Sequence, residues 1–188
     1  MNKLTIFIVL GILCLNFNAK AQEPISEIKP LKIGEHLPDT LRSKIFDATN
    51  AKSERLSISL QNYKGKLILL DFWATWCTNC IAKFPTLDSL QQQYAKQLQV
   101  ILVNTPFRKD TPKTIAAKLV NAPNLQSIIL DDSLKAYFPY TYIPHYVWLG
   151  AKGELLALSN SDWVNPQMVK LMLAQYGRQK ATDDESKN

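Results

Sequence analysis

Two cysteines three residues apart, Cys77 and Cys80, are the residues of this chain best suited to covalent chemistry. They follow an apolar run, Leu67–Leu70, and open a segment with helical periodicity, so a disulfide can close across the first helical turn. A thiol at a helix start lies near unpaired backbone N–H groups and the positive end of the helix dipole, which favour the thiolate. We therefore expect Cys77 to be the nucleophile of thiol–disulfide exchange and Cys80 to be the resolving thiol.

The third cysteine, Cys14, lies in an N-terminal segment typical of an export signal. This segment has Lys3, an apolar run Leu4–Leu15 that is too short to span a bilayer, and the A-x-A cleavage pattern Ala19-Lys20-Ala21. We expect residues 1–21 to be a signal peptide, with a retained N-terminal anchor as the alternative. An exported chain that keeps one close cysteine pair does not use cysteines as a structural framework, so the pair serves redox chemistry or a metal.

Zinc binding is the competing interpretation of the cysteine pair. A structural zinc site needs four ligands. Besides the two cysteines the mature chain offers two histidines, His36 and His145, which form no second pair at ligand spacing. We therefore expect redox chemistry with no metal and no organic cofactor. The mature chain keeps 20 basic and 16 acidic residues, and because the positive excess is scattered we expect no nucleic-acid partner.

The segments around the cysteines predict an α/β fold with a mixed central sheet. Leu67–Phe72 is almost entirely apolar, as in a strand covered on both faces, and a helix from about Cys77 to Gln97 follows it, kinked at Pro85. Two crossover units and a terminal hairpin complete the pattern. The further expected elements are a strand at Gln99–Asn104, a helix at Thr114–Val120, a strand at Ser127–Leu130, a short helix through Phe138, strands at Tyr146–Leu149 and Glu154–Leu158 joined by a turn at Gly150–Gly153, and a last helix capped by Asn165-Pro166.

The flanking segments complete a single domain. Gln22–Lys32 is polar and predicts an extended lead-in, and the alternating segment Leu56–Leu60 predicts one strand of a β-hairpin that precedes the main sheet. With 46% hydrophobic residues the chain can bury one core, which we expect to span residues 33–177. Residues 178–188 are charged and lack apolar content, which predicts a disordered tail.

The segment GKLILLDFWATWCTNC resembles the thioredoxin superfamily, together with a proline five residues after Cys80, an Ile-Pro before a late strand and a Gly-x-x-Gly hairpin. Upstream, IGEHLPD and LSISLQNYKGK resemble the TlpA/ResA-like extracytoplasmic branch. The resemblance covers Ile33 to about Tyr176 and implies a thioredoxin fold, a mixed sheet flanked by helices, with an added N-terminal β-hairpin. Peroxiredoxins share this fold, but their Pro-x-x-x-Thr-x-x-Cys signature would need proline and threonine where Leu70 and Ala74 stand.

The resemblance implies a catalytic role for Asp71, six residues before Cys77. Thioredoxins carry an aspartate at this spacing that relays the proton of the resolving thiol. A buried carboxyl beside a dithiol would have a raised pKa suited to that role. An ordinary solvated carboxylate at a strand end is the alternative.

Three further residues are implied in substrate binding. An X-Pro bond is usually trans, but the superfamily places a cis-proline opposite the dithiol, which here is Pro144. The backbone of the preceding residue, Ile143, would then pair with an extended substrate strand. Trp76, next to Cys77, would contact a partner protein, and His145 would either pack or tune the thiolate.

We thus predict an exported, periplasmic thiol–disulfide oxidoreductase that reduces disulfides of extracytoplasmic partner proteins and is supplied by an upstream thiol protein as electron donor. The membrane would be contacted only through an uncleaved N-terminal segment. The alternative is a thioredoxin-like binding or chaperone module whose dithiol is not catalytic.

Overall fold

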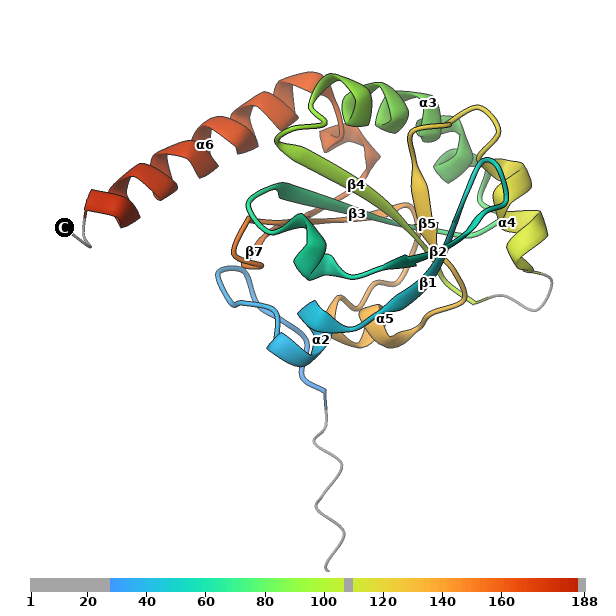
Figure 1. Ribbon diagram of the computed structural model, residues 1–188, viewed down its shortest axis with the longest axis horizontal. Coiled ribbons are helices and arrows are strands. Elements are labelled where there is room, and N and C mark those ends of the chain that lie inside the picture. The colour runs from blue at the N-terminus through green and yellow to red at the C-terminus, as the bar shows by residue number, and fades with distance from the viewer. Residues whose placement is uncertain (1–27, 107–109, 186–188) are drawn as a thin grey trace, which may run out of the picture.

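A single mixed sheet organises the described part of the chain. The computed structural model describes residues 28–106 and 110–185, with the backbone alone for 176–185, so the predicted signal peptide and residues 22–27 of the lead-in lie outside it. Its strands follow the order β2-β1-β5-β4-β3-β6-β7 (Figure 1). They are β1 Phe46–Asn50, β2 Arg55–Ile58, β3 Leu67–Trp73, β4 Leu98–Asn104, β5 Gln126–Ile128, β6 His145–Leu149 and β7 Leu155–Ser159. The helices are α2 Asp39–Ser43, α3 Thr78–Gln93, α4 Pro112–Lys118, α5 Ser133–Tyr137 and α6 Pro166–Glu185, with 3-10 turns η1 Leu60–Tyr63 and η2 Ser161–Trp163.

Strand β3 lies in the middle of the sheet, and all seven of its residues are buried. It pairs in parallel with β4 and antiparallel with β6, and β4 pairs in parallel with β5. The parallel pairs require crossovers, which α3 and α4 provide. The mixed sheet and its flanking helices therefore confirm the predicted thioredoxin fold.

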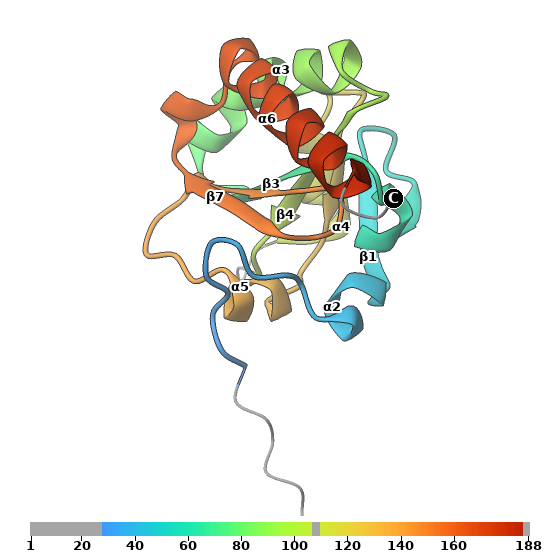
Figure 2. The ribbon, with the colours of Figure 1, turned by 90° about the vertical axis from the view of Figure 1, so that its left-hand side faces the viewer.

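The helices cover the sheet on both faces, with α3 and α6 on one side and α2 and α5 on the other (Figures 1 and 2). Alternate side chains of β3 enter two separate cores, as the period of a strand requires. The α3 side, which we call the first core, includes Leu67, Leu69 and Trp73 of β3, together with Cys77, Cys80, Phe84, Leu102, Tyr146 and Trp148. The second core includes Ile68, Leu70 and Phe72, together with Phe46, Ile101, Leu134 and Val147.

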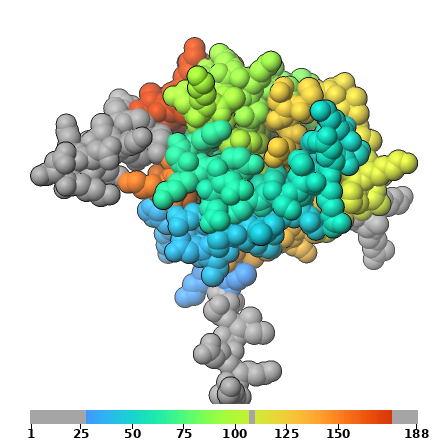
Figure 3. Space-filling model, in the orientation of Figure 1, coloured from blue at the N-terminus to red at the C-terminus, as the bar shows by residue number. Residues whose placement is uncertain are grey.

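The predicted N-terminal hairpin is present and extends the main sheet. β1 pairs antiparallel with β2, with Phe46 opposite Ile58, and its other edge pairs antiparallel with β5, with Ala48 opposite Ile128. The space-filling view shows the first described residues, in blue, at the lower part of one face, directly below the teal residues that come later in the chain (Figure 3). The hairpin is thus part of the same folded body.

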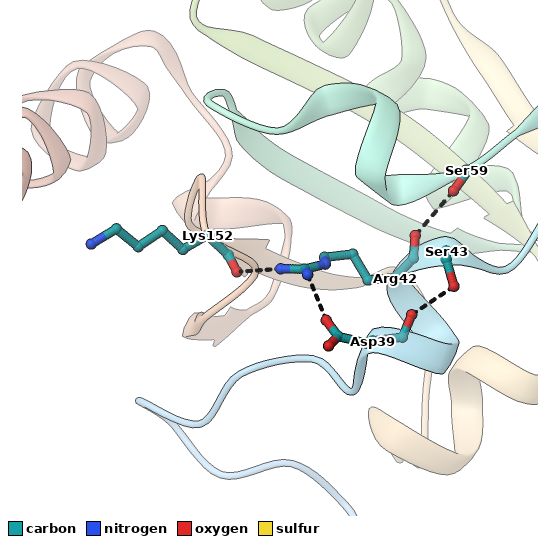
Figure 4. Close-up of polar contacts among 5 residues, drawn as sticks. All are labelled: Asp39, Arg42, Ser43, Ser59 and Lys152. Carbon is teal, nitrogen blue, oxygen red and sulfur yellow. Dashed lines mark hydrogen bonds and ion pairs between the residues drawn. The ribbon is translucent and has the colours of Figure 1, made fainter.

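Arg42, at the end of α2, joins the N-terminal segment to the rest of the body (Figure 4). Its guanidinium pairs with Asp39 one turn earlier and donates to the backbone carbonyl of Lys152 in the β6–β7 turn, at 3.5 Å. Its own carbonyl accepts a hydrogen bond from the Ser59 hydroxyl at 3.0 Å. The hydrogen bond between Arg42 and Lys152 connects segments that are more than a hundred residues apart in the sequence.

The two long helices end at places that differ from the sequence prediction. α3 continues through Pro85 but ends at Gln93 instead of Gln97, because a chain turn at Tyr94 leads directly into β4. α6 runs to Glu185, which corrects the expected disordered tail for residues 178–185. The first part of that stretch, Arg178–Ala181, consists of residues with high helix propensity, which can prolong a helix that tertiary packing has already started.

Candidate active site

The two cysteines form a disulfide at the start of α3. The S–S distance is 2.07 Å and the Cα atoms are 5.3 Å apart. Cys77 is the N-cap residue, and its Sγ accepts a hydrogen bond from the backbone N–H of Cys80 at 3.2 Å. Cys77 is 5% exposed and Cys80 is completely buried. In the reduced protein the unpaired backbone N–H groups at the start of α3 would favour a Cys77 thiolate, whereas the Cys80 thiol would stay buried.

Asp71 lies on the face of β3 that borders the first core, which also contains both cysteines. It alternates with Leu69 and Trp73, whose side chains belong to the first core with both cysteines. Its carboxyl group is fully buried, and neither oxygen has a hydrogen-bond partner. Burial raises the pKa of the Asp71 carboxyl well above its usual value. The structure thus excludes the alternative of a solvated strand-end carboxylate.

Tyr146 is a polar neighbour of Asp71 that sequence analysis did not identify. The two residues are register partners across β3 and β6, and on the other side of Asp71 the β4 partner is Leu102. The Tyr146 hydroxyl is buried without a hydrogen-bond partner. Burial, and then the nearby Asp71 carboxylate, raise the pKa of Tyr146, so its hydroxyl stays protonated at any physiological pH. Only the strand register could reveal this pair.

The Ile143–Pro144 peptide bond is cis, as the resemblance implied. The register places His145 opposite Phe72, so the two residues before His145 continue alongside the segment that leads from β3 to Cys77. Ile143 packs against both cores. The predicted substrate-binding residues of this loop therefore lie next to the strand end that carries the dithiol.

His145 is half-buried at the start of β6. Its ring stacks on Tyr140 with centroids 5.3 Å apart and contacts Phe72 at 5.9 Å. Burial lowers the pKa of His145, so the ring is neutral at pH 7. A neutral ring supplies no positive charge to a neighbouring thiolate, which leaves packing as the role that the geometry supports.

The two tryptophans around the cysteines differ in exposure. Trp73 is completely buried, donates from Nε1 to the Ser127 hydroxyl at 3.1 Å and packs edge-on against Phe84 at 5.0 Å. Trp76, by contrast, is 58% exposed directly beside Cys77. An exposed aromatic residue next to a reactive group is suited to contact a partner protein.

Asp110 is a second buried carboxylate near the site, and sequence analysis did not identify it. It is 8% exposed and accepts hydrogen bonds from the Thr75 hydroxyl and from Nδ2 of Asn104, the latter at 2.9 Å. Thr75 lies two residues before Cys77, and Asn104 ends β4. The carboxylate therefore links the turn before the dithiol to the end of the neighbouring strand.

Other features of the described residues lie away from the dithiol. A groove of about 970 Å³ runs between β7 and α6, with Leu158, Trp163 and Met172 in its lining, and neither cysteine borders it. Among the described side chains, those of residues 28–106 and 110–175, no group of three or more His, Cys, Asp or Glu is placed to hold a metal ion. Within residues 28–106 and 110–185, no helix has the length and apolar character needed to cross a bilayer.

Comparison with known proteins agrees with this geometry. The sequence profile of the family Thioredoxin matches residues 49–131, which include β3, the cysteine pair and β5. Over this segment the chain is similar to the thioredoxin superfamily. Its closer similarities within that superfamily include the thioredoxin-like protein YneN of Bacillus subtilis, 44% identical over 59 residues, or 31% of this chain and 35% of that protein. The thiol-disulfide oxidoreductase ResA of Halalkalibacterium halodurans is 26% identical over 118 residues, or 61% of this chain and 64% of that protein.

The matched segments span between about a third and two thirds of these curated thioredoxin relatives. Solved structures extend the likeness to the whole fold. A thio-disulfide isomerase from Thermus thermophilus superimposes with a TM-score of 0.57 at 20% identity, covering 78% of this chain and 98% of that one. The exposed lipoprotein thioredoxin Etrx1 of Streptococcus pneumoniae gives 0.54 at 23% identity, covering 70% and 99%. At such identities the structural likeness establishes the thioredoxin fold.

Proposed function

We propose that this chain is an exported thiol–disulfide oxidoreductase that reduces disulfides of partner proteins. The observation that carries the proposal is the Cys77–Cys80 pair at the N-terminus of α3, in the same core that the buried Asp71 of β3 faces. A structural disulfide needs neither a helix N-terminus nor a buried, unpartnered carboxyl group. A redox-active dithiol uses both, the first to favour a thiolate and the second to exchange a proton.

The proposed reaction has two exchange steps. The Cys77 thiolate attacks one sulfur of the partner disulfide, which forms a mixed disulfide and releases the other partner sulfur as a thiolate. Cys80 then loses its proton and attacks Cys77, which closes the 77–80 disulfide and releases the second partner sulfur. Two electrons pass from the dithiol to the partner, and an upstream thiol protein must return them.

Asp71 is the proposed proton acceptor for Cys80. A completely buried thiol has no access to solvent, so its proton needs an internal base. Asp71 lies on the face of β3 that borders the first core, and burial raises its pKa, which makes its carboxylate a stronger proton acceptor than that of a solvated aspartate.

The proposed partner surface is the exposed ring of Trp76 together with the Ile143–Pro144 loop. An extended partner segment would pair with the backbone of Ile143 while Trp76 contacts its side chains. Export is supported by the signal-like residues 1–21, and the periplasm follows as the proposed compartment. An oxidising compartment of this kind is where partner disulfides persist.

Trapping the mixed disulfide tests the proposed roles directly. Cys80→Ser removes the resolving thiol, so the reduced variant should accumulate a covalent complex with a disulfide-containing substrate protein through Cys77. Cys77→Ser should accumulate none. The complex is measured by non-reducing electrophoresis and mass spectrometry, and equal labelling of both variants would contradict the assignment.

The reduction potential of the Cys77–Cys80 pair then decides whether electrons pass from the dithiol to partner disulfides or in the opposite direction. Equilibration with a dithiothreitol series should give a value near about −270 mV or lower for a reductase. A value above about −180 mV would instead indicate a disulfide-forming or isomerising protein. Partner binding that survives replacement of both cysteines by serine, without any reversible redox couple, would favour the non-catalytic binding module.

A further inference from the structure

The turn between β3 and Cys77 is attached to the neighbouring strand at two points. The Thr75 hydroxyl donates to Oδ1 of Asp110, and the backbone N–H of Thr105 donates to the carbonyl of Trp73 at 3.1 Å. The second oxygen of Asp110 accepts a hydrogen bond from Asn104 Nδ2 at 2.9 Å. Asp110 thus connects the turn to the end of β4 through both of its oxygens.

The Asp110 side chain is buried, so its hydrogen bonds to Thr75 and Asn104 fix its position. A buried carboxylate is destabilising unless hydrogen bonds satisfy it, and here two neutral donors do so. The ion pairs found among the side chains of residues 28–106 and 110–175 involve other carboxylates, those of Asp39, Asp47 and Asp131. Asp110 therefore acts in the described structure as a bridge between two segments.

The need for this bridge depends on the redox state. In the oxidised protein the disulfide joins Cys77 to Cys80, and the backbone N–H of Cys77 also donates to the Ala74 carbonyl at 3.0 Å. Reduction removes the covalent bond. The turn is then held by the Ala74 contact, the Thr105 contact and the Asp110 bridge, so the bridge matters most when Cys77 is the attacking thiolate.

We propose that Asp110 is a positioning residue, which holds Thr75 and thereby keeps the Ala74–Trp76 turn, and with it Cys77, in the geometry for attack. It does not touch the reacting sulfur atoms. This inference rests on the proposed function, because it concerns the reactivity of the same dithiol. It predicts that the hydrogen bonds of Asp110, and not its charge, are required.

The variant Asp110→Asn separates a requirement for the hydrogen bonds of Asp110 from a requirement for its charge. The amide introduced by Asp110→Asn keeps an oxygen for the Thr75 hydroxyl. Its new N–H group can donate to Oδ1 of Asn104, which is buried without a partner, once the Asn104 amide turns over. Asp110→Ala removes both bonds, and Thr75→Val removes the contact to the turn while keeping the side-chain shape.

We expect Asp110→Ala and Thr75→Val each to slow reduction of a protein disulfide about tenfold. The double variant should be no slower than either single variant, because both substitutions remove the same Thr75–Asp110 hydrogen bond. Asp110→Asn should stay within about threefold of the wild type. Asp131→Ala is the matched control, because that carboxylate holds Lys44 and Ser133 and should leave the rate unchanged. An Asp110→Asn rate as low as that of Asp110→Ala, or additive effects, would overturn the proposal.

A second measurement does not depend on redox activity. Hydrogen exchange of the Cys77 amide should accelerate about tenfold in Thr75→Val, and more in the reduced than in the oxidised protein. Unchanged exchange in both states would overturn the positioning role. If the wild type reduces no protein disulfide, the proposed function fails, and the exchange result still decides whether the bridge orders the turn.

Discussion

At the scale of single residues, the site combines two carboxyl groups in opposite situations. Asp110 has a hydrogen-bond donor for each oxygen, whereas Asp71 has none. An unsatisfied buried carboxyl favours its neutral form, so Asp71 keeps a proton at a pH where a solvated aspartate would have lost it. A group that destabilises the fold in its charged form is typical of a site built for proton transfer.

Asp71→Asn should stabilise the protein in a pH-dependent way. Both states are protonated below the unfolded pKa of about 3.9, and above it the unfolded chain binds fewer protons than the folded one. The free energy of unfolding of the wild type therefore falls as pH rises through the raised folded pKa, by about 1.4 kcal/mol for each unit of elevation. Urea unfolding of the oxidised protein at pH 4 and pH 8 should show an advantage of the variant that grows with pH.

Asp71→Asn should also change the pH–rate profile. Above the Asp71 pKa the wild-type carboxylate accepts the proton of Cys80, so the variant should turn over at least about tenfold more slowly well above pH 7. Below that pKa the wild-type group is already protonated, and the two rates should converge. The measurement is steady-state reduction of a protein disulfide between pH 5 and pH 9. Superimposable profiles would rule out the relay.

At the scale of elements, α3 does more than present the cysteines, because it also completes the edge of β4. β5 is short and pairs only with Ile101–Val103, which leaves the start of β4 without a strand on that side. The side chain of Gln91 in α3 instead bonds the backbone groups at the start of β4 that a neighbouring strand would otherwise bond. Its Oε1 accepts the Val100 N–H at 2.7 Å, and its Nε2 donates to the Leu98 carbonyl at 3.4 Å.

Gln91→Leu should lower the free energy of unfolding by about 1–3 kcal/mol, because the buried Val100 N–H loses its acceptor. Gln92→Leu, at the exposed neighbouring position, should change it by less than about 0.5 kcal/mol. Urea midpoints of the two variants provide the comparison. Equal midpoints would show that water or a rearranged strand satisfies the amide.

At the scale of the whole molecule, the N-terminal hairpin and the thioredoxin sheet form one body. β1 lies between β2 and β5 in a continuous sheet, and Phe46 is buried in the second core with Ile68 and Phe72 of β3. The other face of β3 carries the dithiol site. Loss of packing at the hairpin should therefore affect the same cooperative unit that contains the active site.

Phe46→Ala should cost about 3–5 kcal/mol in unfolding free energy, with the tryptophan signal of the site and the far-UV signal of the sheet still changing in a single transition. Ile45→Ala is the matched control, because Ile45 is 72% exposed, and should be nearly neutral. Chemical denaturation monitored by fluorescence and circular dichroism tests both points. Two separate transitions would show that the hairpin folds independently.

The sequence by itself determined the features that depend on neighbouring residues. The apolar run of β3 and the cysteine spacing at the helix start are local patterns, and they predicted the central strand, the nucleophile and the α/β fold. The cis-proline loop before β6 was implied by the resemblance to the thioredoxin superfamily. The position of Asp71 at the end of an apolar strand was compatible with a buried or a solvated carboxyl group, and the structure shows that it is buried.

Only the tertiary structure decided which distant residues meet. Tyr146 lies opposite Asp71 because β3 and β6 pair in one register, and a shift by one residue would turn the tyrosine to the other core. Asp110 reaches Thr75 from a loop 35 residues away, and Gln91 replaces a strand that ends early. Hydrophobic periodicity cannot predict such contacts, because they depend on how separately predicted elements are placed relative to one another. The same placement brings the dithiol, the buried Asp71 and the Asp110–Thr75 hydrogen bond into one part of the fold.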